Sequence, residues 1–144
     1  MSSLYFHSEE IEFELSNRQE HVDWIFSFIN SRGFQVGELN YVFCSDDYLL
    51  EINRAHLNHD YYTDIITFDY VDEKVLNGDI FISIDRVEDN AKSFSVTFAD
   101  ELRRVIAHGA LHLMGLNDKS PVEQREMREA EDQALELYKG LKTS

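Results

Sequence analysis

Cysteine and proline are almost absent from this chain. Cys44 is the only cysteine among 144 residues, so no disulfide can form within the chain, which is long enough to bury a core without one. The thiol lies in the apolar run Tyr41–Cys44, where we expect it to be buried and unreactive. Pro121 is the only proline. Because no repeat or low-complexity tract interrupts the sequence, we expect a single domain over residues 1–144.

Long apolar runs are absent as well. None approaches the roughly 20 residues that a membrane-spanning helix requires, and the N-terminus has no basic stretch followed by an apolar segment. The sequence therefore predicts no membrane span and no secretory signal. Together with the single cysteine, this favours a cytoplasmic location.

Basic residues are scarce relative to acidic ones. The chain has 13 Lys and Arg against 28 Asp and Glu, a net charge of -15. A protein of this charge repels phosphate backbones at long range, which argues against a generic nucleic-acid binder. Binding to RNA would therefore have to use a local basic cleft or a partner protein.

The periodicity of apolar residues predicts an α+β fold. Strands are expected at Ile11–Leu15, Glu38–Ser45, Asp64–Val71 and Asp79–Ile84, with Asp72–Gly78 as a hairpin connection between the last two. Helices are expected at Arg18–Asn30 (stopped by Gly33), after a cap at Asp46 or Asp47, at Asp85–Phe94, between Thr97 and Gly115, and from Ser120 to about Leu141. About four strands in a mixed sheet would thus pack with about five helices.

The most informative segment is His108-Gly-Ala-Leu-His112-Leu-Met-Gly115-Leu-Asn-Asp118. Helix residues four apart lie on one face, with Cβ atoms about 5–6 Å apart, so both imidazoles can reach one metal ion. Gly115 can end the helix in a left-handed conformation and let the chain double back. Asp118 can then supply a third ligand. Three protein ligands and one open position are typical of a catalytic zinc site.

This spacing is that of the metzincin proteases and predicts a zincin-like metal helix, with one difference. The metzincin general base is a glutamate directly after the first histidine, where this chain has Gly109. A metallopeptidase is therefore disfavoured. The site could still bind a metal and lower the pKa of a bound water, and beyond that metal-bound water the sequence identifies no catalytic group.

The segment His108–Gly115 resembles the signature of the YbeY family of bacterial endoribonucleases and rRNA maturation factors (UPF0054-type metalloproteins). Other blocks add to the resemblance. Thr63–Phe68 is similar to the family's T-D-V-L-S-F strand, Gly78–Ile80 to its G-D-I strand and Ile52–Asn53 to its L-N helix. In order and spacing these blocks cover roughly residues 45–120.

The resemblance implies a metal-dependent endoribonuclease specific for single-stranded RNA. It further implies a role in ribosome quality control and in maturation of the 16S rRNA 3′ end, with the small ribosomal subunit, its RNA and ribosomal proteins as partners. By position, His108 and His112 carry over as metal ligands. Most members have a histidine as third ligand, where this chain has Asp118. We expect one zinc ion per chain, while Fe²⁺ or another divalent metal would also suit this ligand set.

A second departure concerns phosphate binding. The family usually has an arginine in the loop after its L-N helix, where it would stabilise phosphate charge. The corresponding residue here is Leu57. Arg54 lies one turn earlier and could replace that arginine, or it could simply lie on a solvated helix face.

A few further residues are candidates for the site. Glu101, two turns before the first metal-binding histidine, could orient a ligand or be exposed. Lys119, next to the third ligand, could contact phosphate. His59 could contact substrate, and Tyr61 could stack on a base, although a solvated or buried role is equally open. The acidic residues of the last helix are expected to form a solvated face: Glu123, Glu126, Glu129, Glu131 and Asp132.

Two classes of function therefore compete. One is a metal-dependent hydrolase of RNA phosphodiesters. The other is a non-catalytic ribosome-assembly factor with a structural metal. The net charge favours the second, because a ribosomal protein could supply a contact that bare RNA would resist. Peptidase activity is a third, less favoured alternative.

Overall fold

The computed structural model describes residues 3–57, 63–70 and 73–143. These residues form four strands and five helices, in the order β1 (Ser3–Glu9), α1 (Arg18–Ser31), β2 (Gln35–Cys44), α2 (Asp46–Leu57), β3 (Ile65–Asp69), β4 (Val75–Ser83), α3 (Ile84–Ser93), α4 (Phe98–Leu113) and α5 (Pro121–Thr143). The predicted α+β class is confirmed. Within the described ranges, no helix combines the length and apolar character needed to cross a membrane.

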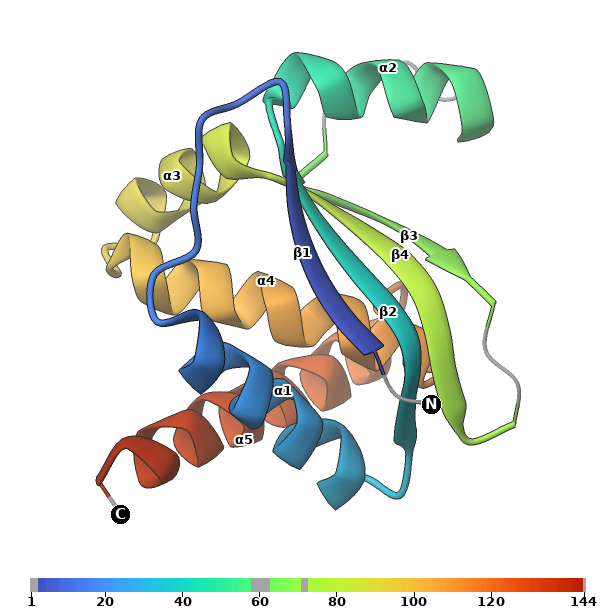
Figure 1. Cartoon of the computed structure of the whole chain (residues 1–144), viewed down its shortest axis with the longest axis vertical. Helices are drawn as coiled ribbons and strands as arrows, with labels where there is room; N and C mark the ends of the chain where they lie inside the picture. The colour runs from blue at the N-terminus through green and yellow to red at the C-terminus, as the bar shows by residue number, and fades with distance from the viewer. Residues whose placement is uncertain (1–2, 58–62, 71–72, 144) are drawn as a thin grey trace.

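The strands form one mixed sheet in the order β1-β2-β4-β3. β1, β2 and β4 run parallel, and β3 runs antiparallel to β4 (Figure 1). Parallel neighbours need a crossover connection, which α1 supplies between β1 and β2. The β3–β4 pair confirms the predicted hairpin, although β4 begins at Val75 and so includes residues expected in the connection.

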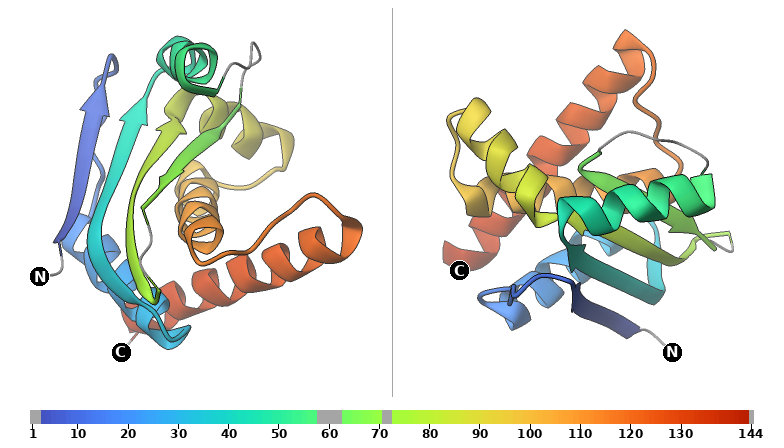
Figure 2. Two further views of the ribbon diagram at one scale, coloured as in Figure 1. Left: turned by 90° about the vertical axis from the view of Figure 1, so that its right-hand side faces the viewer. Right: turned by 90° about the horizontal axis from the view of Figure 1, so that it is seen from above.

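Helices cover both faces of the sheet, with the larger core on the side of α1, α4 and α5 (Figure 2). Side chains alternate along a strand, and β4 divides the two cores accordingly. Ile80 and Ile82 are fully buried in the larger core, whereas Phe81 packs with Leu49 of α2 in the smaller one. Because α4 contacts β3 and β4, the helix that carries both histidines lies directly on the sheet.

Capping signals fix the helix ends on either side of the predicted metal segment. Thr97 Oγ accepts a hydrogen bond from the backbone N–H three residues later (3.1 Å) and caps α4. Gly115 has a φ of 103°, and the N–H that follows it donates back into the last turn of α4, as in a left-handed helix end. Ser120 and Glu123 form a reciprocal capping box at the start of α5, which confirms the predicted helix start at Ser120. The end of α4 and the start of α5 are therefore both fixed by local hydrogen bonds, which sets the length of the turn between them.

The N-terminal strand differs from the prediction. We expected a strand over Ile11–Leu15, but β1 is Ser3–Glu9, and Ile11–Leu15 pairs with no strand among the described residues. Glu10 has a φ of 54° and turns the chain out of the sheet, and Ser8 Oγ then donates to the carbonyl of Phe13. The apolar side chains of the segment still pack on the core, so alternating burial without strand pairing explains the period-2 pattern.

The start of α2 also differs from the prediction. Neither Asp46 nor Asp47 is the cap, because Ser45 Oγ accepts the backbone N–H of Tyr48 (3.1 Å). Asp46 lies in the first turn, and its carboxylate pairs with Arg86 of α3 (2.8 Å). This ion pair connects helices on opposite faces of the sheet.

The single cysteine lies at the end of β2. Its side chain is fully buried in the smaller core, and the thiol donates to the carbonyl oxygen of Ile82 (3.5 Å). Burial, with the nearby carboxylate of Asp46, raises the pKa of Cys44 to about 12. The prediction of a buried thiol is confirmed.

Gly109 lies where α4 packs on β3 and β4. A Cβ atom at this position would lie 2.8 Å from Cγ2 of Ile80 and 3.0 Å from Cδ1 of Ile65. The Cγ2 atom is bonded directly to the Cβ of a strand residue, so it cannot move away unless the strand moves too. At this distance between helix and sheet, position 109 has no room for a glutamate side chain, which gives a structural reason for the missing protease base.

Replacing Gly109 with alanine should destabilise the fold by about 1–2 kcal/mol, because overpacking outweighs the better helix propensity of alanine. Urea unfolding followed by circular dichroism measures the change. Gly140→Ala in α5 is the matched control, since nothing lies within 4 Å of a Cβ atom there and propensity alone should stabilise by up to about 1 kcal/mol. Equal effects of the two substitutions would contradict the packing argument.

Candidate metal centre

The three predicted ligand side chains converge on one point. His108 and His112 come from the last two turns of α4, and Asp118 returns to them after Gly115. The two Nε2 atoms lie 2.9 Å apart, and Asp118 Oδ2 lies 3.4 Å from Nε2 of His108 and 3.7 Å from Nε2 of His112. Among the described residues, this is the one group of three such donors close enough to hold a single metal ion. All three side chains are partly exposed, so the site opens to solvent.

Hydrogen bonds hold the other nitrogen of each ring. Nδ1 of His108 lies 2.6 Å from a carboxylate oxygen of Glu131, and Nδ1 of His112 lies 3.0 Å from the carbonyl oxygen of Leu116. Both acceptors favour a proton on Nδ1, which leaves the Nε2 lone pairs directed at the other ligands. Two such lone pairs and a carboxylate match the donor chemistry of a divalent cation. The residues present therefore fit a metal ion.

The two histidines differ in proton affinity. Burial acts to lower the pKa of His108, but the hydrogen bond and charge of Glu131 raise it above the ordinary histidine value. Burial and the neighbouring charge of His108 lower the pKa of His112. Because a metal binds only the neutral imidazole, acidification through the raised pKa of His108 would disfavour metal binding.

Glu131 is a site residue that the sequence analysis missed, and it corrects the prediction that the acidic residues of the last helix form a solvated face. Its side chain is 6% exposed, and its second carboxylate oxygen accepts from Arg104 (2.9 Å). Glu131 lies four residues after buried Met127 and three before buried Ala134, within the apolar stripe of α5. A carboxylate inside such a stripe is the signal that could have identified it.

A further carboxylate, Asp64, interacts electrostatically with His108. Burial raises the pKa of Asp64, while the positive charges of His108 and Arg86 act in the opposite sense. Asp64 immediately precedes β3, which lies beside β4 and against α4. In the sequence, Asp64 was recognisable only as the start of a predicted strand and as part of the family-like block Thr63–Phe68, neither of which places its carboxylate at the metal centre.

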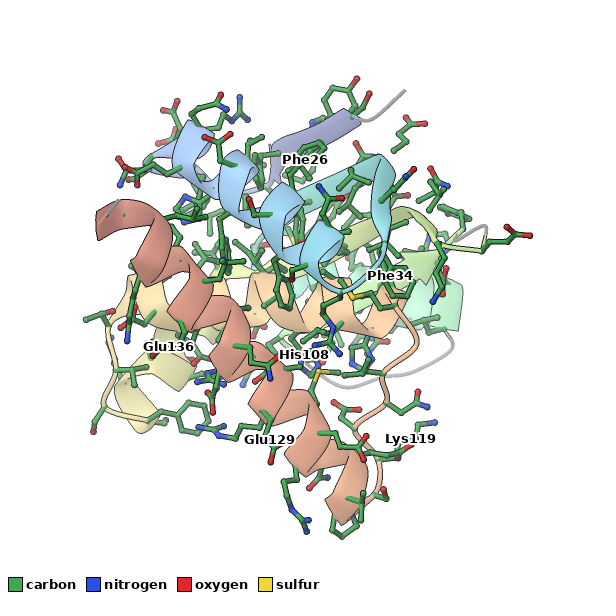
Figure 3. All side chains as sticks on the ribbon, turned by 90° about the horizontal axis from the view of Figure 1, so that it is seen from below. Phe26, Phe34, His108, Lys119, Glu129 and Glu136 are labelled. Atoms are coloured by element: carbon green, nitrogen blue, oxygen red, sulfur yellow. The ribbon has the colours of Figure 1, made fainter. Side chains whose placement is uncertain are left out.

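The other candidates on α4 and after it lie in different surroundings. Glu101 is buried on the same face of α4 as the histidines, and burial raises its pKa. No hydrogen bond joins Glu101 to either histidine in the described part of the chain, and Glu131 fills the orienting role expected of it. Lys119 is exposed next to Asp118, close to the start of α5, while His108 lies behind that helix (Figure 3).

Two of the candidates around the end of α2 belong to the described residues, and two do not. Arg54 is exposed near the end of the helix, and Leu57, at the family's arginine position, is its last residue and is 39% exposed. His59 and Tyr61 lie outside the described residues.

Comparison with curated proteins finds relatives over nearly the whole chain. A protein named Endoribonuclease YbeY from Flavobacterium johnsoniae is 50% identical over 129 residues, which are 90% of this chain and 93% of the relative. A relative of the same name from Cytophaga hutchinsonii is 49% identical and covers 95% of this chain and 96% of its own length. One from Bacteroides thetaiotaomicron is 48% identical, with 94% and 98% covered.

The fold and a family model agree with these relatives. The solution structure of TM1509 from Thermotoga maritima superposes with a TM-score of 0.67 at 25% identity, covering 96% of this chain and 90% of that protein. The family model described as Endoribonuclease YbeY matches residues 4–139. That range includes both histidines, Gly109 and Asp118. The family resemblance is confirmed: the chain belongs to the Endoribonuclease YbeY family.

Proposed function

We propose that this chain is a zinc-dependent endoribonuclease that cleaves single-stranded RNA, with His108, His112 and Asp118 as ligands of one metal ion. The observation that carries the proposal is the convergence of two Nε2 atoms and one carboxylate oxygen while both rings are held by other hydrogen bonds. The relatives are named endoribonucleases, which supports RNA cleavage as the reaction. A single domain over residues 1–144, acting in the cytoplasm, completes the proposal.

The proposed substrate is ribosomal RNA. As the family resemblance implies, the reaction would serve maturation of the 16S rRNA 3′ end and ribosome quality control. The small ribosomal subunit would then be the partner. A net charge of -15 supports an encounter assisted by ribosomal proteins, because phosphate backbones are repelled at long range.

Zinc is the proposed ion because two histidines and a carboxylate are an accepted set of zinc ligands, although iron(II) suits the same set. When bound, such an ion supplies a Lewis acid that stabilises negative charge on the phosphoryl group. Glu131 and the Leu116 carbonyl hold the two rings in one orientation, so the ligands need little rearrangement on binding. Lys119 and Arg54 remain candidates for contact with a phosphate oxygen.

Asp64 is our candidate for the group that accepts a proton from the attacking water. It is not one of the three ligands, and it interacts with His108 from the side of β3. Because burial raises its pKa, its carboxylate is a stronger base than that of an exposed aspartate, as a proton acceptor requires. Glu101, which forms no hydrogen bond to the ligands among the described residues, is a less favoured candidate.

His112→Ala is expected to abolish cleavage of single-stranded RNA and to reduce bound zinc from about one ion per chain, and Asp118→Ala should weaken metal binding in the same direction, because each substitution removes a ligand. Gel assays and elemental analysis of the purified proteins measure the two effects. His7→Ala, which removes an exposed histidine on β1, is the matched control. Equal cleavage by wild type and His112→Ala would reveal a contaminating nuclease. A zinc-loaded wild type that cleaves no single-stranded RNA would favour the assembly factor.

Glu131→Gln should lower zinc affinity by about 10- to 100-fold, because it weakens the hydrogen bond that orients the first ligand. Competition with a fluorescent zinc chelator measures the affinity. Glu129→Gln, two residues away on the exposed face of α5, keeps the same charge change and should have no effect. Unchanged zinc affinity in Glu131→Gln would remove this residue from the site.

Asp64→Asn should lower kcat by about 10²- to 10⁴-fold, the usual contribution of a general base, while zinc content stays at one per chain. In the wild type, the rate should fall with acidification through the raised pKa of Asp64, because the protonated carboxyl cannot accept a proton. At saturating zinc, where protonation of His108 does not release the metal, the variant should lose this acid limb. A pH profile of RNA cleavage tests the assignment, and an unchanged profile would overturn it.

A further inference from the structure

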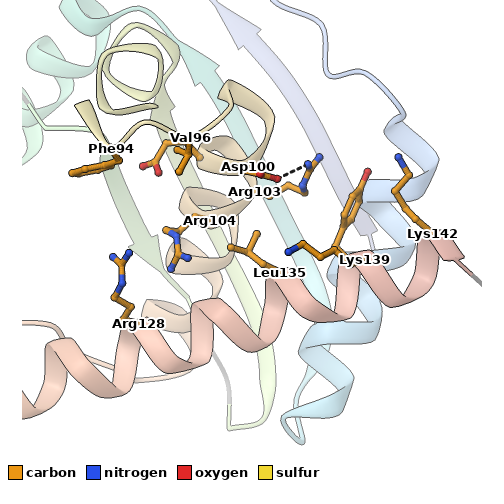
Figure 4. Close-up of a pocket in the computed structure, with 11 residues that line it drawn as sticks. Phe94, Val96, Asp100, Arg103, Arg104, Arg128, Leu135, Lys139 and Lys142 are labelled. Carbon is orange, nitrogen blue, oxygen red and sulfur yellow. Dashed lines mark hydrogen bonds and ion pairs between the residues drawn. The ribbon is translucent and has the colours of Figure 1, made fainter. Parts of the chain in front are cut away.

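A cleft of about 680 Å³ lies between α4, α5 from Arg128 to Lys142, and the segment that joins α3 to α4 (Figure 4). Its lining includes five basic side chains: Arg103, Arg104, Arg128, Lys139 and Lys142. Two acidic side chains, Asp100 and Glu101, also line it. Five of the 13 basic residues of a chain with a net charge of -15 therefore surround one cleft, which makes it the kind of local basic surface that RNA binding requires here.

Not all of these cations are engaged by the protein itself. Arg104 pairs with Glu131 and Asp132, and Arg103 pairs with Asp100. Arg128 and Lys142 form no ion pair with the described residues, although Arg128 interacts electrostatically with Glu101 and Lys142 Nζ lies 5.8 Å from the centre of the Tyr138 ring. Lys139 makes only an exposed pair with Glu136 (3.7 Å), a type of contact that contributes little.

The cleft also has an exposed apolar edge. Phe94 is 64% exposed and, like Arg128, lies toward the opposite end of the cleft from Lys142 (Figure 4). The inner wall is formed by Leu135 and Tyr138, and the Arg103 guanidinium lies 4.1 Å above the Tyr138 ring. A large exposed aromatic ring in the same cleft as several basic side chains is the combination that single-stranded nucleic acids recognise, since bases stack on the ring and phosphates contact the cations.

The cleft and the candidate metal centre share one face of α4. Glu101, Arg104, His108 and His112 are spaced by three, four and four residues and so form a single stripe. With a rise of about 1.5 Å per residue, Arg104 lies about 6 Å along the helix from His108. Glu131 contacts both of these side chains. The near end of the cleft therefore lies about one helical turn from His108. The buried Glu131 side chain fills the space between Arg104 and His108, so an RNA strand that reaches both places has to pass outside this contact.

We propose that this cleft binds the single-stranded RNA segment next to the phosphodiester that is cleaved at the metal centre. Arg128 contacts a phosphate at one end of the cleft, Lys139 and Lys142 contact phosphates at the other end, and Phe94 stacks on a base. The inference rests on the proposed endoribonuclease function and names its substrate-binding surface. An acidic polypeptide could satisfy the cations, but it would leave the exposed Phe94 ring without a stacking partner, so single-stranded RNA matches more of the surface.

Binding can be measured separately from cleavage. In a His112→Ala background with chelator present, fluorescence anisotropy of a labelled single-stranded RNA reports affinity while the RNA stays intact. Arg128→Gln/Lys142→Gln should weaken binding at least tenfold at low salt. It should also reduce the slope of log K against log salt by about 1.4, since each phosphate contact to a single strand contributes about 0.7. Arg32→Gln/Lys74→Gln, whose side chains do not line the cleft, should change neither quantity.

The stacking contact has its own variant. Phe94→Ala should weaken binding about tenfold with no change in salt slope, because it removes no charge. Tyr70→Ala, which removes a ring that is 61% exposed elsewhere, is the control. Circular dichroism and urea midpoints equal to wild type confirm that each surface variant is folded.

RNA cleavage and RNA binding to the cleft can be contradicted independently. If wild type cleaves RNA but both cleft variants bind as tightly as their controls, the cleft assignment is overturned and the function stands. If wild type neither cleaves nor binds RNA, the proposed endoribonuclease function is overturned, and the cleft assignment that rests on it is overturned as well. If polyglutamate competes with RNA at equal concentration and Phe94→Ala has no effect, the cleft recognises acidic polypeptide, and the RNA assignment is overturned.

Discussion

The hydrogen bond between Glu131 and His108 joins the parts of the molecule on which the candidate site depends. The carboxylate comes from α5 and the ring from α4, and Arg104 occupies the second carboxylate oxygen. A buried carboxylate is costly unless it is paired, so α5 can pack here only when both partners are in place. The packing of α5 on α4 and the orientation of the first metal ligand are therefore one structural arrangement. The same arginine also lines the basic cleft, which ties that surface to the site.

Charge explains why this arrangement suits a cation. Asp64, Asp118 and Glu131 all interact with His108. A divalent ion at the Nε2 atoms would relieve repulsion among these groups. A ligand that binds only the folded state stabilises it, and metal binding is generally coupled to folding and to proton release. The turn that carries Asp118 back to α4 would gain most from this coupling, because its own contacts to the histidines are the longer ones.

Local signals in the sequence predicted the metal helix well. The spacing of His108 and His112, the left-handed Gly115 and the helix start at Ser120 each depend on a few neighbouring residues, and each is found in the structure. Glu131 was missed because its role depends on α5 packing against α4, 23 residues away in sequence. The strand at Ile11–Leu15 was wrong because period-2 burial also occurs in an extended segment that no strand pairs with. Pairing across the sheet is a tertiary property that a local pattern does not contain.

The absent side chain of Gly109 has a consequence for how the site can change in evolution or design. The metal ligands share their spacing with the metzincin proteases, which suggests a short path between the two chemistries. The short distance between α4 and the β3–β4 face prevents this conversion, since Ile80 and Ile65 occupy the space that a glutamate at position 109 would need. Acquiring the protease base would require the helix to move outward, which would disturb the packing that positions Glu131. The two activities are thus separated by backbone spacing, and a single substitution cannot convert one into the other.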